Sequence, residues 1–123
     1  MVEINIFRNR DASLLEPGDV LFEAGDEGDA MFAVVEGEVE LVRDGRVLET
    51  VGAGGILGEL ALVDPGPRSA MARARTAARV VRVSLEDFTF LVHEHPTFAL
   101  QVMSAMAERL RRTNTAGQDA PTS

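Results

Sequence analysis

The chain has 123 residues, the size of one domain with its own hydrophobic core. A formal charge of −8 argues against nucleic acid as a partner, because binding a phosphate backbone requires a basic surface. Cysteine is absent, which excludes disulfides and thiolate chemistry, and no apolar run approaches the roughly 20 residues of a membrane span. Residues 1–6 lack the pattern of a signal peptide, so we expect a cytoplasmic protein without membrane association.

Short segments with the pattern of β-strands make up the first two thirds of the chain. Residues 1–13 form an N-terminal segment with little signal, in which Ile4, Ile6 and Phe7 are expected to dock on the domain as a short strand or turn. Turns rich in Gly, Pro and Asp then separate predicted strands at 20–23, 31–35, 38–42, 46–51, 70–74 and 79–83. Asp44-Gly45 is a hairpin signal between two of them. Many short strands predict a β-roll or barrel.

The hydrophobic period changes after residue 83. Ser84, followed by acidic residues, has the form of a helix N-cap, and this helix is expected to end near His95-Pro96. A second, longer helix is predicted from Thr97, because apolar residues recur at helical spacing. They are Phe98, Ala99, Val102, Met103, Met106 and Leu110. The composition of residues 116–123 predicts a disordered tail.

The stretch from 52 to 70 carries the strongest functional signal. A Gly-rich turn leads into Gly58-Glu59-Leu60-Ala61-Leu62, and Asp64-Pro65-Gly66-Pro67 then ends any helix after one or two turns. A helix that begins at Gly directs unpaired N–H groups at one spot, which suits a phosphate. Arg68 adds a planar fork of donors and Ser69 a hydroxyl. Because a carboxylate repels phosphate, Glu59 is expected to accept from a sugar hydroxyl.

One segment resembles the phosphate-binding cassette of cyclic nucleotide-binding domains. It consists of Gly58-Glu59-Leu60-Ala61-Leu62, five further residues, and then Arg68-Ser69-Ala70. Glycines upstream in 23–26, 34–39 and 51–55 fall at the spacing of that family, and the resemblance covers residues 14–115. It implies a mainly β fold with C-terminal helices. A double-stranded β-helix, or jelly roll, would span 14–84 with the cassette at 58–70, and lid helices would span 85–115.

The resemblance implies that Arg68 binds the ligand phosphate and that Glu59 accepts from the ribose 2′-hydroxyl. The alternatives are a surface arginine after a turn, and a carboxylate that compensates a helix dipole. Ser69 resembles the bacterial catabolite-activator branch, which favours cyclic AMP, with cyclic GMP as the less favoured ligand.

The remaining cassette residues are expected to act through their backbone or by burial. Gly58, Leu60 and Ala61 would donate backbone N–H groups to the ligand, and Ala70 lies in the same ligand-binding segment. Burial of Leu60 and Leu62 would anchor the cassette.

The end of the last helix, 106–114, resembles the base-capping helix of the catabolite activators. Thr113 and Asn114 stand at the positions that contact the purine, or they form the frayed end of the helix. The apolar stripe of this helix indicates either core packing or the seam of a homodimer.

These features indicate a receptor that signals by lid movement, with no catalytic residues and no metal. His93 and His95 lack a third ligand nearby in sequence. No helix-turn-helix follows, so we expect no DNA binding by this chain and an effector protein in trans, unless the chain is a fragment. The Met start and the tail slightly favour a complete small protein. Two alternatives are an interaction module of the same fold without a nucleotide, and a cupin-like metal enzyme.

Overall fold

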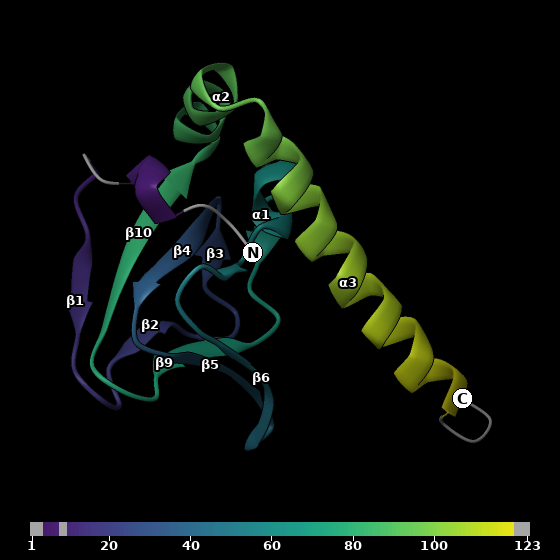
Figure 1. The fold of residues 1–123 in the computed structure, drawn as a ribbon. Coiled ribbons are helices and arrows are strands. Elements are labelled where there is room, and N and C mark those ends of the chain that lie inside the picture. The colour runs from purple at the N-terminus through teal and green to yellow at the C-terminus, as the bar shows by residue number, and fades with distance from the viewer. Residues whose placement is uncertain (1–3, 8–9, 120–123) are drawn as a thin grey trace.

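Antiparallel sheets form the body of the protein (Figure 1). The computed structural model describes residues 4–7 and 10–119, with the side chains of 6–7 and 10–112. In this part of the chain, one four-stranded sheet has the order β1-β10-β4-β7 and a second has the order β2-β9-β5-β6, while β3 and β8 form a separate pair. The strands are β1 Ser13–Leu15, β2 Val20–Phe22, β3 Glu27–Gly28, β4 Ala30–Glu36, β5 Val39–Arg43, β6 Arg46–Val51, β7 Ile56–Leu57, β8 Gly66–Pro67, β9 Met71–Ala74 and β10 Ala78–Ser84.

The predicted hairpin between β5 and β6 is confirmed. Arg43 pairs with Arg46, and the two turn residues between them have positive φ, 53° at Asp44 and 76° at Gly45. Positive φ at both central residues gives the turn the twist of the flanking strands, and Asp-Gly accepts it at low cost. The turn therefore fixes the pairing of Arg46 and Val47, and an irregularity between Leu41 and Val42 shifts the register so that Glu49 pairs with Leu41.

Buried apolar side chains form two clusters, one between the sheets and one beneath the helices. The first cluster contains Val34, Val39, Val51, Leu57, Ala72, Ala78 and Val80. In the second, the Phe98 ring lies 5.9 Å from that of Phe7 and 5.6 Å from that of Phe88. Phe7 ends a 3-10 helix, η1 Ile4–Phe7, so the N-terminal segment docks as expected, but as a single helical turn.

The helices follow the sheets in the predicted order. Ser84 caps α2 Leu85–Glu94 by accepting from the backbone N–H of Asp87, and Asp87 accepts in return from the backbone of Ser84. The short helix α1 Leu60–Val63 precedes β8, and α3 Thr97–Asp119 runs past the body and projects beyond it (Figure 1).

Helix α3 ends later than the sequence suggested. It continues to Asp119, whereas residues 116–123 were predicted to be disordered, and 120–123 lie outside the described residues. A glycine inside a helix costs only about 1 kcal/mol, so Gly117 does not end it. In the described part of the chain, neither α3 nor any other helix combines the length and hydrophobicity needed to cross a membrane.

The apolar stripe predicted for α3 divides between two surroundings. Phe98 and Val102 are buried and Met106 is half-buried against the core. Met103 and Leu110 are exposed, because they lie on the face of the helix turned away from the body.

Candidate functional site

The predicted cassette forms one tight turn followed by one turn of helix. Gly58 has a φ of 71°, and α1 covers only Leu60–Val63. The dipole of so short a helix is small, so binding of an anion here would depend on individual N–H groups. The N–H of Ala61 donates to the carbonyl of Gly58 at 3.2 Å in this conformation.

The two leucines of the cassette differ in burial. Leu62 is buried as expected, but the prediction for Leu60 is wrong, since it is 62% exposed. In so short a helix, neighbouring residues face different directions, and only one of these two faces the core. Ala70 is buried just before β9, and Ser69 beside it is exposed.

Arg68 reaches back across the cassette to Gly58. Its Nη1 donates to the carbonyl of Gly58 at 3.3 Å and its Nη2 to that of Ala30 at 2.7 Å. The guanidinium carbon lies 4.3 Å from the centre of the Phe22 ring and 5.8 Å from that of Phe32. Burial lowers the pKa of Arg68, while the charge of Asp29 raises it. These contacts argue against a plain surface arginine.

Two glycines leave the space that Arg68 occupies. A Cβ atom at Gly28 would lie 2.4 Å from its Nε, and one at Gly58 would lie 2.6 Å from its Nη1. The backbone is held as well, because the N–H of Arg68 donates to the carbonyl of Asp26 at 2.7 Å and its carbonyl accepts from Gly25 at 2.8 Å. The turn at 25–28 therefore fixes where Arg68 begins, and the glycines fix where its guanidinium ends.

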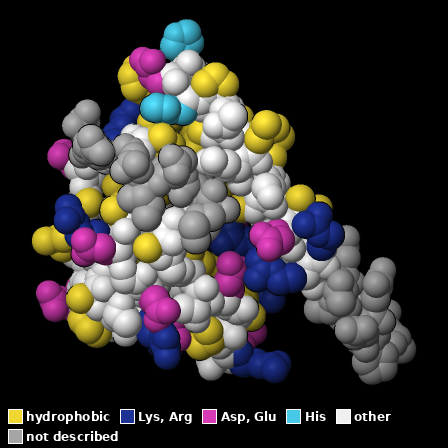
Figure 2. Space-filling view, viewed as in Figure 1, with side chains coloured by type: hydrophobic (Ala, Val, Ile, Leu, Met, Phe, Trp, Pro, Cys, Tyr) yellow, Lys and Arg dark blue, Asp and Glu magenta, His cyan; other side chains and the backbone are white. Residues whose placement is uncertain are grey.

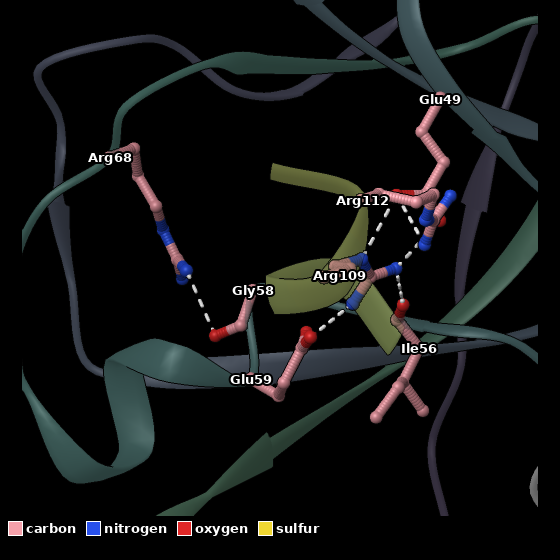
Figure 3. Close-up of polar contacts among 7 residues, drawn as sticks. All are labelled: Glu49, Ile56, Gly58, Glu59, Arg68, Arg109 and Arg112. Atoms are coloured by element: carbon pink, nitrogen blue, oxygen red, sulfur yellow. Dashed lines mark hydrogen bonds and ion pairs between the residues drawn. The ribbon is translucent and has the colours of Figure 1, made fainter. Parts of the chain in front are cut away.

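Glu59 is 4% exposed, and its carboxylate accepts a hydrogen bond from Nη1 of Arg109 on α3. Although Glu59 is the N-cap residue of α1, its side chain makes no capping hydrogen bond. The geometry therefore does not support dipole compensation as its main role. Figure 3 shows Arg68 and Arg109 reaching from opposite sides toward Gly58 and Glu59.

Arg109 is a residue of the site that the sequence reasoning missed. Its Nε and Nη2 each donate to Glu49 at 3.0 Å, and Nη2 also donates to the carbonyl of Ile56 at 2.5 Å. Burial would lower the pKa of Arg109, but the hydrogen bond to Glu49 and the charge of Glu59 raise it above its usual value. A signal was present, since Arg109 follows Val102 by seven residues and so lies on the buried face of the helix.

A cavity of about 240 Å³ lies between β6, the turn at 52–55 and α3. Arg109 and Glu49 line it, together with Gln101 and Ala105 of the helix. Arg68 and Glu59 do not line it, so Arg109 connects the cavity with the cassette through its contact with Glu59. Figure 2 shows basic and acidic side chains gathered where α3 meets the body.

Some predicted site residues are not placed by these contacts. The backbone of Thr113 and Asn114 continues α3, but their side chains lie outside the described ones. Among the described residues, no group of three or more His, Cys, Asp or Glu side chains is arranged to hold a metal ion. His93 and His95 are exposed at the end of α2.

Comparison with known proteins gives three concordant results. The family model of the cyclic nucleotide-binding domain matches residues 13–95. A CRP-like cAMP-activated global transcriptional regulator of Mycobacterium tuberculosis is 33% identical over 102 residues, which are 79% of this chain and 46% of that protein. The catabolite activator protein of Thermus thermophilus superposes with a TM-score of 0.80 at 30% identity, over 93% of this chain and 56% of that one.

A shorter solved structure matches nearly end to end. The N-terminal domain of a transcriptional regulator from Streptomyces coelicolor A3(2) is 36% identical with a TM-score of 0.64, covering 97% of this chain and 86% of that one. These likenesses confirm the predicted jelly roll with C-terminal helices. The chain spans about half the length of the curated relatives it matches, 46% of the Mycobacterium protein and 49% of the Thermus receptor.

Proposed function

Because the chain belongs to the cyclic nucleotide-binding domain family, we propose that it is a receptor domain for a cyclic nucleotide, with cyclic AMP preferred over cyclic GMP. The observation that carries this proposal is the convergence of Arg68 and Glu59 on one turn. Nη1 of Arg68 lies 3.3 Å from the carbonyl oxygen of Gly58. Glu59, which follows Gly58 in the chain, carries a buried carboxylate. A cation at the carbonyl of Gly58 and an anion on the next residue suit a ligand with a phosphate next to a hydroxyl.

In this proposal the phosphate lies between the guanidinium of Arg68 and the backbone N–H groups of the cassette. The ribose 2′-hydroxyl donates to Glu59, which has one oxygen bonded to Arg109. Ser69 is exposed next to Arg68, where its hydroxyl can donate to the phosphate or to the base. The preference for cyclic AMP rests on Ser69 and on the description of the Mycobacterium relative as cAMP-activated.

Helix α3 is proposed to report the occupied state. Arg109 joins this helix to Glu59, so a ligand on Glu59 changes the contacts that hold the helix. The populations of two helix positions then shift by the difference in ligand affinity between them. Thr113 and Asn114 would contact the base, and the signal would pass to an effector protein in trans or to a further segment of a longer chain. No catalytic step and no metal enter this mechanism.

The exposed face of α3 supports a homodimer as part of the proposal. Leu100, Met103 and Leu110 are exposed and separated by three and seven residues, which is the spacing of a helical seam. Light scattering of the chain with and without cyclic AMP is expected to give the mass of a dimer. A monomer mass in both samples would exclude this arrangement at the concentration measured.

Isothermal titration with cyclic AMP, with cyclic GMP in parallel, tests the ligand. Cyclic AMP is expected to bind more tightly, and at a hundredfold excess over Kd it should raise the free energy of unfolding by about 2.7 kcal/mol. Absence of heat and of thermal stabilisation with both nucleotides would overturn the proposal. An interaction module without a nucleotide would then be the better interpretation, because Arg68 and Glu59 already have partners within the chain.

A further inference from the structure

Glu49 on β6 holds two arginines of α3. Its Oε1 and Oε2 accept from Nε and Nη2 of Arg109, each at 3.0 Å, and its Oε1 lies 3.6 Å from Nη2 of Arg112. Two parallel hydrogen bonds to one guanidinium fix both the position and the plane of that group. Glu49 therefore controls the orientation of Arg109.

The surroundings favour the charged form of each partner. Burial would raise the pKa of Glu49, but the hydrogen bond from Arg109 and the charges of Arg109 and Arg112 hold it below its usual value. Nη2 of Arg109, which donates to Glu49, also donates to the carbonyl of Ile56 in β7 at 2.5 Å. Arg109 is thus held between β6 and β7, immediately before the cassette.

This placement leaves one oxygen of Glu59 available. Arg109 occupies Oε1 of Glu59, and in the described part of the chain the other oxygen accepts no hydrogen bond from the protein. No fully buried side-chain oxygen or nitrogen among these residues lacks a partner, so this second oxygen retains contact with solvent. A ligand hydroxyl can therefore donate to it without displacing Arg109.

We propose that Glu49 is a positioning residue that acts through Arg109 on Glu59 and thereby strengthens the preference of the site for a ligand with a 2′-hydroxyl. This inference rests on the proposed function of the site. Without the carboxylate of Glu49, Arg109 loses its two-point anchor and can turn away from Glu59. The Glu59 carboxylate then loses its fixed orientation, and the hydrogen bond to the ribose weakens.

The direct test compares cyclic AMP with 2′-deoxy cyclic AMP by isothermal titration of the full chain. In the unmodified protein the dissociation constant of 2′-deoxy cyclic AMP should exceed that of cyclic AMP. We expect Glu49→Gln to reduce this ratio, 2′-deoxy cyclic AMP over cyclic AMP, by about tenfold, the effect of losing one charge-assisted hydrogen bond. Glu40→Gln is the matched control and should keep the ratio of the unmodified protein. Glu40 also pairs with an arginine, Arg73 at 3.2 Å, and its side chain is 15% exposed against 20% for Glu49, but it links β5 to β9 rather than to α3.

A purely structural role for Glu49 predicts a different result. Loss of affinity for both ligands by the same factor, or an unchanged ratio of dissociation constants, would overturn the inference. Failure of the unmodified protein to bind either ligand would instead overturn the proposed function, and with it the effect of Glu49 on ligand choice.

Hydrogen exchange of the ligand-free protein tests the contact independently of any nucleotide. In Glu49→Gln, amides of α3 around Arg109 should exchange about tenfold faster than in the unmodified protein and in Glu40→Gln. Equal exchange in all three proteins would show that Glu49 does not hold the helix, and would overturn the positioning role even if nucleotides bind.

Discussion

Replacement of Arg68 by alanine tests the cation of the site most directly. The change removes the donors to the carbonyls of Ala30 and Gly58 and the cation that lies 4.3 Å from the Phe22 ring. It also removes the group proposed to bind the phosphate, while the backbone contacts of the residue with the turn at 25–26 remain possible.

The expected magnitude follows from the proposed placement of the phosphate against Arg68. Loss of one partner of a buried, hydrogen-bonded charge pair costs about 2–5 kcal/mol of binding free energy. Since about 1.4 kcal/mol corresponds to a factor of ten, cyclic AMP should bind at least about 30-fold more weakly to Arg68→Ala. Arg68→Lys should recover only part of this loss, because an ammonium lacks the planar fork of donors.

The free protein should be affected less than the complex. Arg68 is partly exposed, and its aromatic contact is worth about 0.5–1 kcal/mol at such a site. With two hydrogen bonds lost as well, the free energy of unfolding should fall by about 1–2 kcal/mol. Urea unfolding and isothermal titration on the same variants separate the two effects.

Arg82→Ala is the control for charge alone. Arg82 forms an exposed ion pair with Asp29 at 3.2 Å, close enough to Arg68 to affect its pKa, but it makes no contact with the cassette. Its removal should leave the affinity for cyclic AMP within about twofold of the unmodified protein and cost less than about 1 kcal/mol of stability. Equal affinity of Arg68→Ala and the unmodified protein would refute the phosphate assignment, whatever the change in stability.

Three further changes test the packing and electrostatics around the site. The carboxyl of Glu49 has a pKa lowered from 4.5. Its contribution to stability is therefore present above about pH 4.5 and is lost as the pH falls through the lowered pKa. Urea unfolding between about pH 3 and 6 should show a weaker pH dependence for Glu49→Gln than for the unmodified protein. Gly58 and Gly45 have φ of 71° and 76°, so Gly58→Ala and its control Gly45→Ala should share a backbone cost of about 1–2 kcal/mol in urea unfolding. Only Gly58→Ala places a Cβ atom against Arg68, so only this variant should bind cyclic AMP more weakly in titration. Phe98→Ala empties a buried position between two aromatic rings and should lower the free energy of unfolding by about 3–5 kcal/mol in chemical denaturation. Replacement of the exposed Phe90 by alanine should lower it by less than about 1 kcal/mol, and equal losses of stability would contradict the assigned core.

The amino-acid sequence by itself determined the features that depend on neighbouring residues. The Asp44-Gly45 turn, the Ser84 N-cap and the end of α2 before Pro96 were each predictable, because turn and cap chemistry acts over a few residues. The cassette was recognisable for the same reason, since its glycines and Arg68 lie within about a dozen positions of one another. Its proposed ligand contacts remain predictions.

The features that depend on pairing between distant parts of the chain were decided only by the tertiary structure. The strands β3, β7 and β8 are two residues long and form their hydrogen bonds with strands elsewhere in the chain. They are too short for an alternation of apolar and polar residues to indicate them in the sequence. The exposure of Leu60 likewise follows from which side of α1 faces the core.

The partners of Glu59 show the same limit at the site. Arg109 is separated from Glu59 by 50 residues and from Glu49 by 60. These contacts exist because the hairpin register places Glu49 on β6 and because packing of Phe98 and Val102 places α3 against it. A sequence pattern specifies which face of a helix is buried, but the partner that this face meets is fixed only when sheet register and helix docking are both set.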